Sequence, residues 1–364
     1  MLENKETFKG IKMGCSQCNQ LYLLEEKSAH LYFLSEFDEL IQKSKIFLTG
    51  LDYKLTQLNG LNYTKVTNIK TFFTDNLAAL NTYFNKMERE DIKICLADPD
   101  KAFDFQALML AKPLQYYINL VEDKEFFDII QNESLTSHFQ PIIQASDRSI
   151  YGYEALVRGV DPKGKLVYPD VLFAKSERNN MDFHLDRLCR ETALKTAAVK
   201  NINQKVFINF IPTSIYDPEF CLKSTVKWAN QLEFDYKNIV FEVVETASVK
   251  DKEHLKKVLN YYREQGFQVA LDDVGEGFSN LNMIIELRPD IIKIDRNIIC
   301  DIDKSELKHS VYEALYKISH DNGIEVLAEG VETQEEIDTV EAIGVDYIQG
   351  YYFSKPTAES IRKI

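Results

Sequence analysis

From about residue 135 to residue 349, short apolar runs alternate with longer segments in which apolar residues recur every three or four positions. The short runs fit buried strands, as in a parallel sheet, and the longer segments fit helices packed beside them. The predicted strands are Ser137–Ile143, Tyr151–Arg158, Val206–Phe210, Ile239–Val244, Gln268–Asp273, Ile291–Asp295, Glu325–Glu329 and Tyr347–Gln349.

Between most of these runs lie segments that fit amphipathic helices, namely Phe183–Val199, Lys252–Glu264, Ser305–Ser319 and Gln334–Ile343. Strands and helices that alternate over such a length predict an α/β fold of the TIM-type (β/α)8 barrel class. The first two runs are joined too tightly for a helix, so we expect the first strand to be antiparallel to the second.

The region before the barrel follows a different pattern. From His30 to about Val121 the apolar spacing predicts helices whose core faces include Leu31, Leu34, Phe37, Leu40 and Ile41, and later Leu77, Leu80, Phe84 and Met87. Lys93–Ala97 fits a short strand that ends at the Asp98-Pro99-Asp100 turn, and Lys124–Ile130 fits a short helix. We therefore expect a smaller, mixed and mainly helical domain at residues 1–130, followed by the barrel at residues 131–364.

The run Val269–Gly277 carries two adjacent carboxylates, Asp272 and Asp273, where an apolar strand gives way to a glycine-flanked loop. Like charges side by side repel each other, and a bound cation is a common reason to retain such a pair. Aspartate and glycine are also ordinary loop residues. This run alone leaves both a metal site and a solvated loop open.

Polar residues interrupt or follow seven of the predicted strands. They are Glu154 and Arg158, Asn209, Glu242 and Glu245, Asp272 and Asp273, Lys293, Glu329 and Glu332, and Gln349. In a barrel of this class the carboxyl ends of the strands carry the chemistry. An all-oxygen set of Glu154, Asn209, Glu242 and Asp272 suits one divalent ion, and Asp273 and Glu329 suit a second. The alternative is a group of buried salt bridges with Arg158, Lys293 and Arg187, but the acids outnumber these bases.

Composition narrows the classes of partner. A content of 45% hydrophobic residues suffices for buried cores, and the formal net charge of -14 disfavours a nucleic acid polymer or an anionic membrane as partner. No apolar run approaches the roughly 20 residues of a membrane span, and Met1–Lys12 is polar, so we expect a cytoplasmic protein without membrane insertion.

Of the six cysteines only Cys15 and Cys18 are closely spaced. This spacing leaves three interpretations open, namely a zinc site, a redox pair and two ordinary thiols.

The motifs at these positions resemble the EAL domain family, the cyclic di-GMP phosphodiesterases, from about Leu135 to the C-terminus. The resemblance rests on Phe139-Gln140-Pro141-Ile142, Glu154-Ala155-Leu156-Val157-Arg158, Asn209, Phe241-Glu242-Val243-Val244-Glu245, Leu271-Asp272-Asp273, Ile292-Lys293-Ile294-Asp295, Ala328-Glu329-Gly330-Val331-Glu332-Thr333 and Gln349-Gly350-Tyr351. It implies opening of cyclic di-GMP to linear pGpG by in-line hydrolysis, in bacterial second-messenger signalling, with two Mg2+ or Mn2+ ions.

The resemblance also implies a role for each residue. The first ion would be held by Glu154, Asn209, Glu242 and Asp272, with Asp272 shared and Asp273 on the second ion. Gln140 and Arg158 would face the substrate, with Gln349 at the same mouth. Lys293 would orient or deprotonate the attacking water, and Glu329 would hold the second ion and its water. Glu332 would support this cluster, and Glu245 would brace the loop after Asp273.

Two matters stay open at this stage. The loop Asp273–Asn280 departs from the family pattern at Val274, Phe278 and Asn280, and we expect a working loop with altered regulation. Glu276, at a variable position of that pattern, adds a negative charge that either tunes ion affinity or faces solvent. Some members of the family bind cyclic di-GMP without hydrolysing it, so a receptor that signals through the N-terminal domain is the alternative function. An appended domain in this family commonly regulates or dimerises, and we expect a homodimer.

Overall fold

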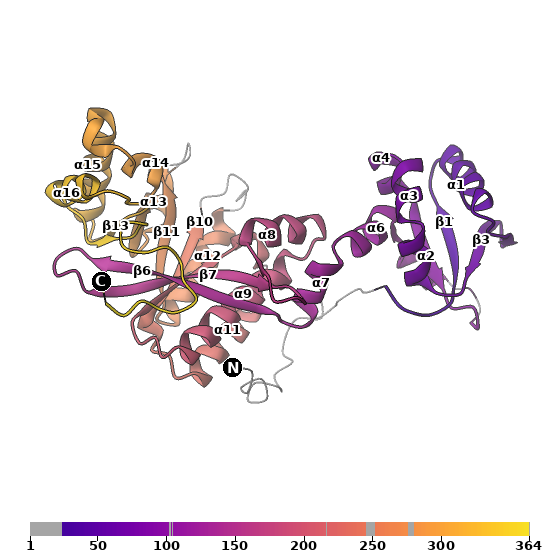
Figure 1. Cartoon of the computed structure of the whole chain (residues 1–364), viewed down its shortest axis with the longest axis horizontal. Coiled ribbons are helices and arrows are strands. Elements are labelled where there is room, and N and C mark those ends of the chain that lie inside the picture. Colours follow the sequence, from indigo (N-terminus) through magenta and orange to yellow (C-terminus); the bar gives the residue numbers. More distant parts are fainter. Residues whose placement is uncertain are drawn as a thin grey trace. The chain divides into compact units, whose positions relative to one another are not determined.

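The computed structural model of the chain describes residues 24–101, 103, 105–215, 217–244, 252–275 and 280–363 (Figure 1). They form two compact units, one of residues 24–132 with residues 177–179, and one of residues 133–363 without those three. None of the helices in these ranges has the length and apolar character needed to cross a membrane.

The N-terminal unit is a mixed α/β fold around an antiparallel sheet with strand order β2-β3-β1-β4-β5. Its strands are β1 (Ala29–Leu34), β2 (Leu55–Leu58), β3 (Leu61–Val66), β4 (Lys93–Ala97) and β5 (Lys112–Pro113). Its helices are α1 (Asp38–Gly50), α2 (Ile69–Asp75), α3 (Leu77–Tyr83), α4 (Lys86–Asp91), α5 (Phe105–Met109), α6 (Leu114–Glu122) and α7 (Lys124–Gln131). The smaller, mixed N-terminal region expected from the sequence is confirmed.

Some details of that expectation were wrong. Leu31 and Leu34 lie in strand β1 and not in a helix, because β1 pairs with a neighbour on each side and is buried on both faces, which removes the polar alternation of a strand. Phe37, the N-cap of helix α1, is 55% exposed and Met87 is 77% exposed, so neither is a core residue. The chain leaves helix α3 at Phe84, and Asn85 starts a new helix with a capping box, which shifts the periodicity. The strand predicted at Lys93–Ala97 is confirmed as β4.

The second unit contains a closed eight-stranded barrel, as the sequence predicted. The sheet order is β6-β14-β13-β12-β11-β10-β9-β7-β8, and β6 also pairs with β7, which closes the barrel and leaves β8 outside it. As expected, β6 is antiparallel to both of its neighbours, and the other barrel pairs are parallel. The strands are β6 (Leu135–Gln144), β7 (Ile150–Val160), β8 (Leu166–Val167), β9 (Lys205–Phe210), β10 (Ile239–Val244), β11 (Gln268–Val274), β12 (Ile291–Ile294), β13 (Glu325–Ala328) and β14 (Tyr347–Ile348).

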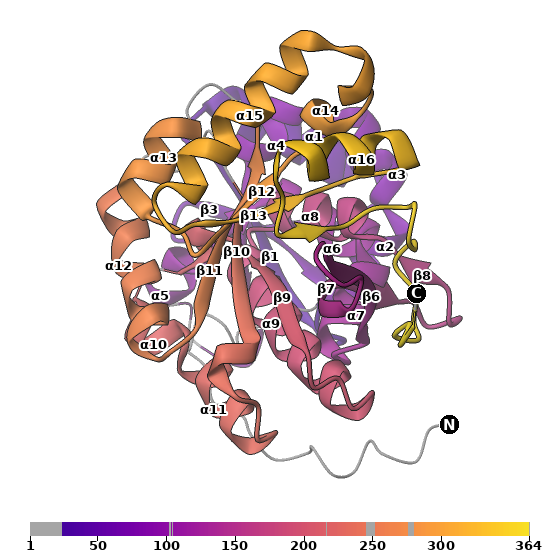
Figure 2. The ribbon, with the colours of Figure 1, turned by 90° about the vertical axis from the view of Figure 1, so that its left-hand side faces the viewer.

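Helices surround these strands, as Figure 2 shows for α11, α12, α13, α15 and α16. The helices are α8 (Pro169–Arg178), α9 (Asp182–Val199), α10 (Pro218–Cys221), α11 (Lys223–Gln231), α12 (Lys252–Glu264), α13 (Asn280–Leu287), α14 (Arg296–Ile299), α15 (Glu306–His320) and α16 (Gln334–Ile343). The four predicted helices are confirmed as α9, α12, α15 and α16, with ends within one residue of those predicted.

A layer of apolar side chains fills the barrel interior. It consists of Ile142, Phe207, Val240, Ala270, Ile291, Leu327 and Tyr347, all of them buried. These residues come from seven different barrel strands, which is how the interior of such a barrel is normally packed. A separate and larger apolar cluster joins the outer faces of the strands to the helices. The interior layer fills the barrel on the side away from the carboxyl ends of the strands. Polar groups can therefore occupy the interior at the carboxyl ends.

Candidate active site at the carboxyl ends of the strands

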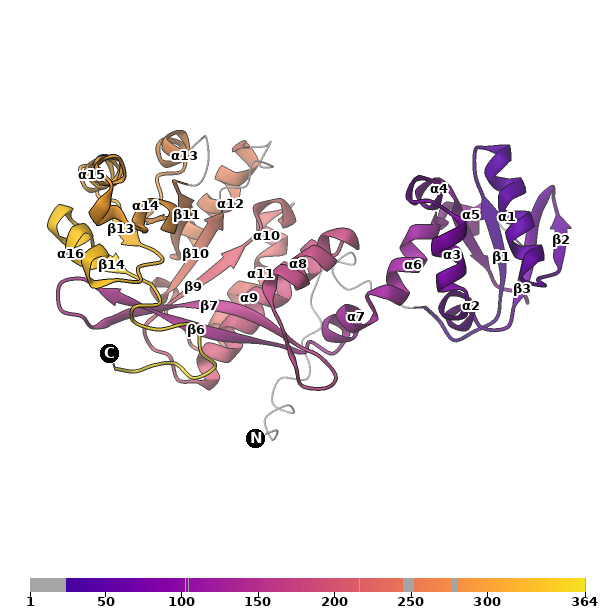
Figure 3. The same ribbon diagram turned by 45° about the horizontal axis from the view of Figure 1, so that its top comes forward.

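The predicted polar residues lie on the next layer of the barrel. A strand has a period of two residues, so the residue two positions after each interior residue also faces inward. From the interior layer this step leads to Asn209, Glu242, Asp272, Lys293, Glu329 and Gln349. On the antiparallel strand β6 the same step runs backwards, from Ile142 to Gln140. One geometric rule therefore brings together residues that span more than 200 positions of the sequence. Figure 3 shows the neighbouring strands β9, β10 and β11, which carry three of them.

Lys293 lies at the centre of this layer and contacts three carboxylates. Its Nζ is 2.6 Å from Oε1 of Glu242, 3.0 Å from Oδ1 of Asp272 and 2.7 Å from Oε1 of Glu329. The Lys293 side chain is 1% exposed and that of Glu242 is fully buried. Strands β10, β11 and β12 and the residue after β13 supply these four groups, so closure of the barrel creates the cluster.

Glu154 is held by two amides. Its Oε1 accepts a hydrogen bond from Nδ2 of Asn209 (3.0 Å), and its Oε2 accepts one from Nε2 of Gln349 (2.7 Å). Gln349 is buried, so its amide orients Glu154 from within the barrel. The Gln140 side chain lies opposite Glu154 in the β6–β7 pair and donates to the carbonyl of Ser354 (3.2 Å).

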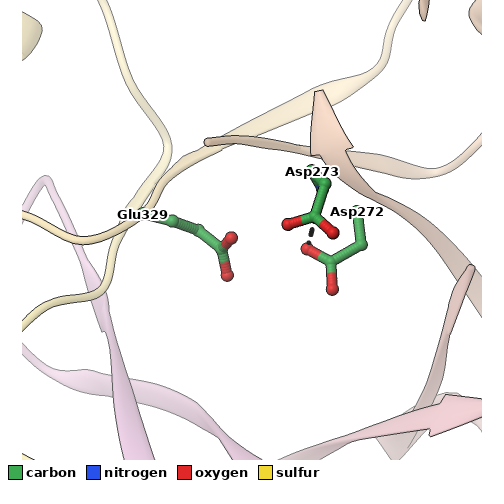
Figure 4. Close-up of side chains that lie close together, drawn as sticks. All are labelled: Asp272, Asp273 and Glu329. Carbon is green, nitrogen blue, oxygen red and sulfur yellow. Dashed lines mark hydrogen bonds between the residues drawn. The ribbon is translucent and has the colours of Figure 1, made fainter. Parts of the chain in front are cut away.

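Asp272, Asp273 and Glu329 form a second, partly accessible carboxylate group. One oxygen from each lies within 4.8 Å of the others, an arrangement that could hold a metal ion. Figure 4 shows Glu329 facing the two aspartates from the opposite side. The aspartates project together because the pairing of β11 with β12 shifts register between Leu271 and Val274, and Asp273 has a left-handed backbone with φ 54°. The Asp273 N–H donates to Oδ1 of Asp272 (3.0 Å).

The site carries an excess of negative charge. Burial raises the pKa of Glu242 and of Glu329 well above the usual carboxyl range, and the neighbouring carboxylates raise each further, against the opposing effect of Lys293. Burial lowers the pKa of Lys293, but Asp272, Glu154, Glu242 and Glu329 together raise it well above its usual value. The surrounding acids thus hold Lys293 as an ammonium ion.

The donor set fits divalent metal ions. The site holds five carboxylates, those of Glu154, Glu242, Asp272, Asp273 and Glu329, and Lys293 pairs with Glu242, Asp272 and Glu329 among them. Carboxylate and amide oxygens are the ligands that hard divalent cations prefer. Of the three bases that the alternative of buried salt bridges invoked, only Lys293 pairs with carboxylates of this site in the described residues. Arg187 pairs with Glu191 (3.1 Å), and Arg158 forms no ion pair with a carboxylate in the described part of the chain.

Other predicted residues lie away from this cluster. The Glu332 side chain is 37% exposed and pairs with Arg296, so the structure does not bring it to the carboxylates. Arg158 lies further along β7 and donates to the carbonyl of Val157 (2.7 Å). Val274 is buried at the end of β11. Glu245, Glu276, Phe278, Cys15 and Cys18 lie outside the described residues.

Sequence reasoning did not identify a buried ion pair next to this site. Asp186 and Arg190 on helix α9 are each 2% exposed, and Oδ2 of Asp186 accepts from Nη2 of Arg190 (2.7 Å). Oδ1 of Asp186 accepts from the backbone N–H of Ile211 (2.8 Å), two residues beyond Asn209. The spacing of four residues on a predicted helix was a visible signal, but exposed pairs with that spacing are common.

Comparison with known proteins agrees with this geometry. The EAL domain family matches residues 123–356. The chain is 28% identical over 231 residues to the probable cyclic di-GMP phosphodiesterase PdeG of Escherichia coli (strain K12), covering 62% of this chain and 45% of that protein. It is 29% identical over 234 residues to the cyclic di-GMP phosphodiesterase PdeR of the same organism, covering 62% of this chain and 34% of that protein. The chain therefore spans less than half the length of these two relatives.

Two solved structures show the same fold. A standalone EAL protein from Vibrio cholerae O395, in a form bound to c-di-GMP, is 36% identical with a TM-score of 0.58, covering 63% of this chain and 94% of that one. An EAL domain protein from Listeria monocytogenes EGD-e is 26% identical with a TM-score of 0.58, covering 65% of this chain and 94% of that one.

Proposed function

This chain belongs to the EAL domain family, and we propose that it is a metal-dependent phosphodiesterase that hydrolyses cyclic di-GMP to linear pGpG. The observation that carries the proposal is the inward-facing polar layer, in which carboxylates from β7, β10, β11 and β13 gather around Lys293. The names of relatives such as PdeR support the substrate.

We assign the metal ligands from the two carboxylate groups. Glu154, Asn209, Glu242 and Asp272 would hold one Mg2+ or Mn2+ ion, and Asp273 and Glu329 would hold a second that shares Asp272. Such a pair of ions lowers the pKa of a bound water and screens the charge of a phosphodiester. The ions also explain how a protein with a net charge of -14 accepts an anionic substrate.

The protein's own groups orient the reactants. The Nζ of Lys293 is held in place by three carboxylates, and it is the group that positions the attacking water and exchanges a proton with it. When cations neutralise these carboxylates, the pKa of Lys293 falls and the amine becomes a better proton acceptor. The apolar layer beneath keeps water from reaching the site through the barrel, so water and substrate enter at the carboxyl ends of the strands.

The remaining residues of the site bind substrate or hold the ligands in place. Gln140 lies opposite Glu154 on β6, and Arg158 lies four residues further along β7; both would face the substrate. Gln349 keeps Glu154 in one orientation. Glu332 would act indirectly, because its partner Arg296 packs against Gly330, the residue that follows Glu329.

Substitution of a ligand tests this assignment. Glu154→Ala and Asp272→Asn should each abolish Mn2+-dependent release of pGpG, measured by chromatography, while circular dichroism shows an intact fold. Asp321→Asn, an exposed carboxylate on the C-cap of α15, is the control and should keep wild-type turnover. Near-normal turnover in either site variant contradicts the ligand assignment, and binding of cyclic di-GMP without release of pGpG by the wild type supports the receptor function.

We further propose that residues 1–130 form a regulatory or dimerising domain of a cytoplasmic homodimer. The compact α/β unit at residues 24–132 supports an independent domain there. Cys95, Cys189, Cys221 and Cys300 form no disulfide in the described part of the chain, as expected in a reducing compartment.

A further inference from the structure

A short hairpin beyond the carboxylates carries an aromatic residue that no role above uses. Strand β8 pairs with the end of β7, with Gly159 opposite Val167 and Val160 opposite Leu166. The next position in this register places Tyr168 opposite Arg158. Residues that lie opposite each other on antiparallel strands project from the same face, and so do residues four apart on one strand. Tyr168, Arg158 and Glu154 therefore share one face of the hairpin.

Arg158 and Tyr168 are in contact. The guanidinium carbon of Arg158 is 5.1 Å from the centroid of the Tyr168 ring, within the range of a cation–π interaction. The Arg158 side chain is also anchored to the carbonyl of Val157 (2.7 Å). A buried and immobilised guanidinium thus fixes the position of the tyrosine ring.

Both side chains retain unused binding capacity. Arg158 is only 7% exposed, and its Nε has no hydrogen-bond partner in the described part of the chain. Tyr168 is 55% exposed and adds little to the apolar core. Burial lowers the pKa of Arg158, and Tyr168, Glu154 and Tyr351 oppose this, so all three lie within electrostatic range of the guanidinium. Tyr351 is itself 53% exposed.

We infer that Tyr168 is the stacking platform for one nucleobase of the substrate, in addition to the contacts that Arg158 makes. The inference rests on the proposed function, because the ligand is a cyclic dinucleotide whose phosphate lies at the carboxylates. Glu154 and Arg158 are four residues apart, about 13 Å along an extended strand, a span that a dinucleotide with outward-pointing bases can cover. An aromatic ring suits the flat face of a purine, and Tyr168 directly follows β8 in the hairpin that β8 forms with β7.

Steady-state kinetics of the full chain with Mn2+ and cyclic di-GMP test the inference. Tyr168→Leu removes the ring and should raise KM about tenfold, as loss of one base–aromatic stack does, with kcat within about twofold of the wild type. Tyr168→Phe keeps the ring and should retain a wild-type KM. Phe220→Leu, on α10, removes an aromatic ring of similar exposure (52%) and should leave both constants unchanged.

Several other results overturn the inference. An unchanged KM for Tyr168→Leu excludes stacking, and an equal loss in Tyr168→Phe assigns the effect to the hydroxyl group. A fall in kcat together with a lower Tm indicates a structural role. If the wild type binds cyclic di-GMP but releases no pGpG, hydrolysis fails, and the same variants are compared by calorimetric Kd, where a tenfold rise for Tyr168→Leu still supports stacking. A wild type that neither binds nor hydrolyses overturns both proposals.

Discussion

At the scale of single residues, Asp273 combines a carboxylate of the proposed metal site with an unfavourable backbone. Its φ of 54° lies in the left-handed region, which costs an ordinary residue about 1–2 kcal/mol and which aspartate and asparagine tolerate best. The register shift in β11 imposes this conformation and turns Asp272 and Asp273 toward Glu329. Backbone strain of this kind commonly accompanies functional sites.

The left-handed backbone of Asp273 leads to a prediction that does not depend on the charge of its side chain. Asp273→Asn and Asp273→Ala both remove the carboxylate, but only asparagine retains the tolerance for a left-handed backbone. We expect the alanine variant to unfold with a free energy about 1 kcal/mol lower than the asparagine variant, measured by urea denaturation without metal. Equal stabilities contradict a strained backbone at this position.

The raised pKa of Glu242 predicts a pH dependence of stability. A carboxyl whose pKa is higher in the folded than in the unfolded state binds more protons when folded. Its contribution to stability therefore falls as the pH rises from the usual carboxyl range through the raised pKa. Glu242→Gln removes this dependence, so the Tm of the variant minus that of the wild type should increase from pH 5.5 to pH 8 in EDTA, by roughly 2–4 °C. A difference that stays constant with pH contradicts this prediction.

At the scale of elements, helix α9 anchors the end of strand β9. Arg190 donates to Asp186 and to Oγ1 of Thr225 on α11 (2.5 Å), and Asp186 accepts from the backbone of Ile211. The pair thus ties two helices to the strand end that carries Asn209. Because both charges are buried, each depends on the other for compensation.

Removal of one partner should therefore be costly. Asp186→Ala leaves Arg190 buried without a counter-charge and should lower the free energy of unfolding by about 3–5 kcal/mol, measured by urea denaturation. The matched control is Asp321→Ala, which breaks an exposed pair with Lys317 at the same spacing and should change stability by no more than about 0.5 kcal/mol. A small effect at Asp186 indicates that water compensates Arg190.

At the scale of the whole molecule, the open question is what the N-terminal unit contributes. That unit has its own sheet and its own aromatic core, including Phe72, Phe73 and Phe84. Asp123 within it accepts hydrogen bonds from Arg178 (2.9 Å) and Asn179 (2.8 Å). Arg178 and Asn179 follow strand β7 of the barrel in the sequence, but they belong to the N-terminal unit.

A regulatory role predicts a change in activity when this unit is removed. Turnover of residues 131–364 should differ from that of the full chain by about fivefold or more, the size of an ordinary coupling between sites. Light scattering on both proteins shows whether the oligomeric state changes as well. Equal turnover together with an equal oligomeric state contradicts both regulation and dimerisation by the N-terminal residues.

The barrel and most residues of its polar layer follow from the amino-acid sequence. Runs such as Val206–Phe210 and Gln268–Asp273 are buried strands of a parallel sheet, and their local periodicity is strong. Because parallel strands end at the same edge of a sheet, the residues at their carboxyl ends are neighbours in any such barrel. Asn209, Asp272 and Lys293 were predictable for this reason.

Which of these groups are in contact depends on how the chain packs in three dimensions. Leu31 lies in a strand because β1 pairs with β3 and β4. Asp186 and Arg190 are buried because α9 packs against α11. The position of Glu332 depends on its ion pair with Arg296. The Tyr168 contact with Arg158 depended on the register of a two-residue strand. Periodicity reports local conformation, whereas these contacts join segments that are brought together only when the chain is folded.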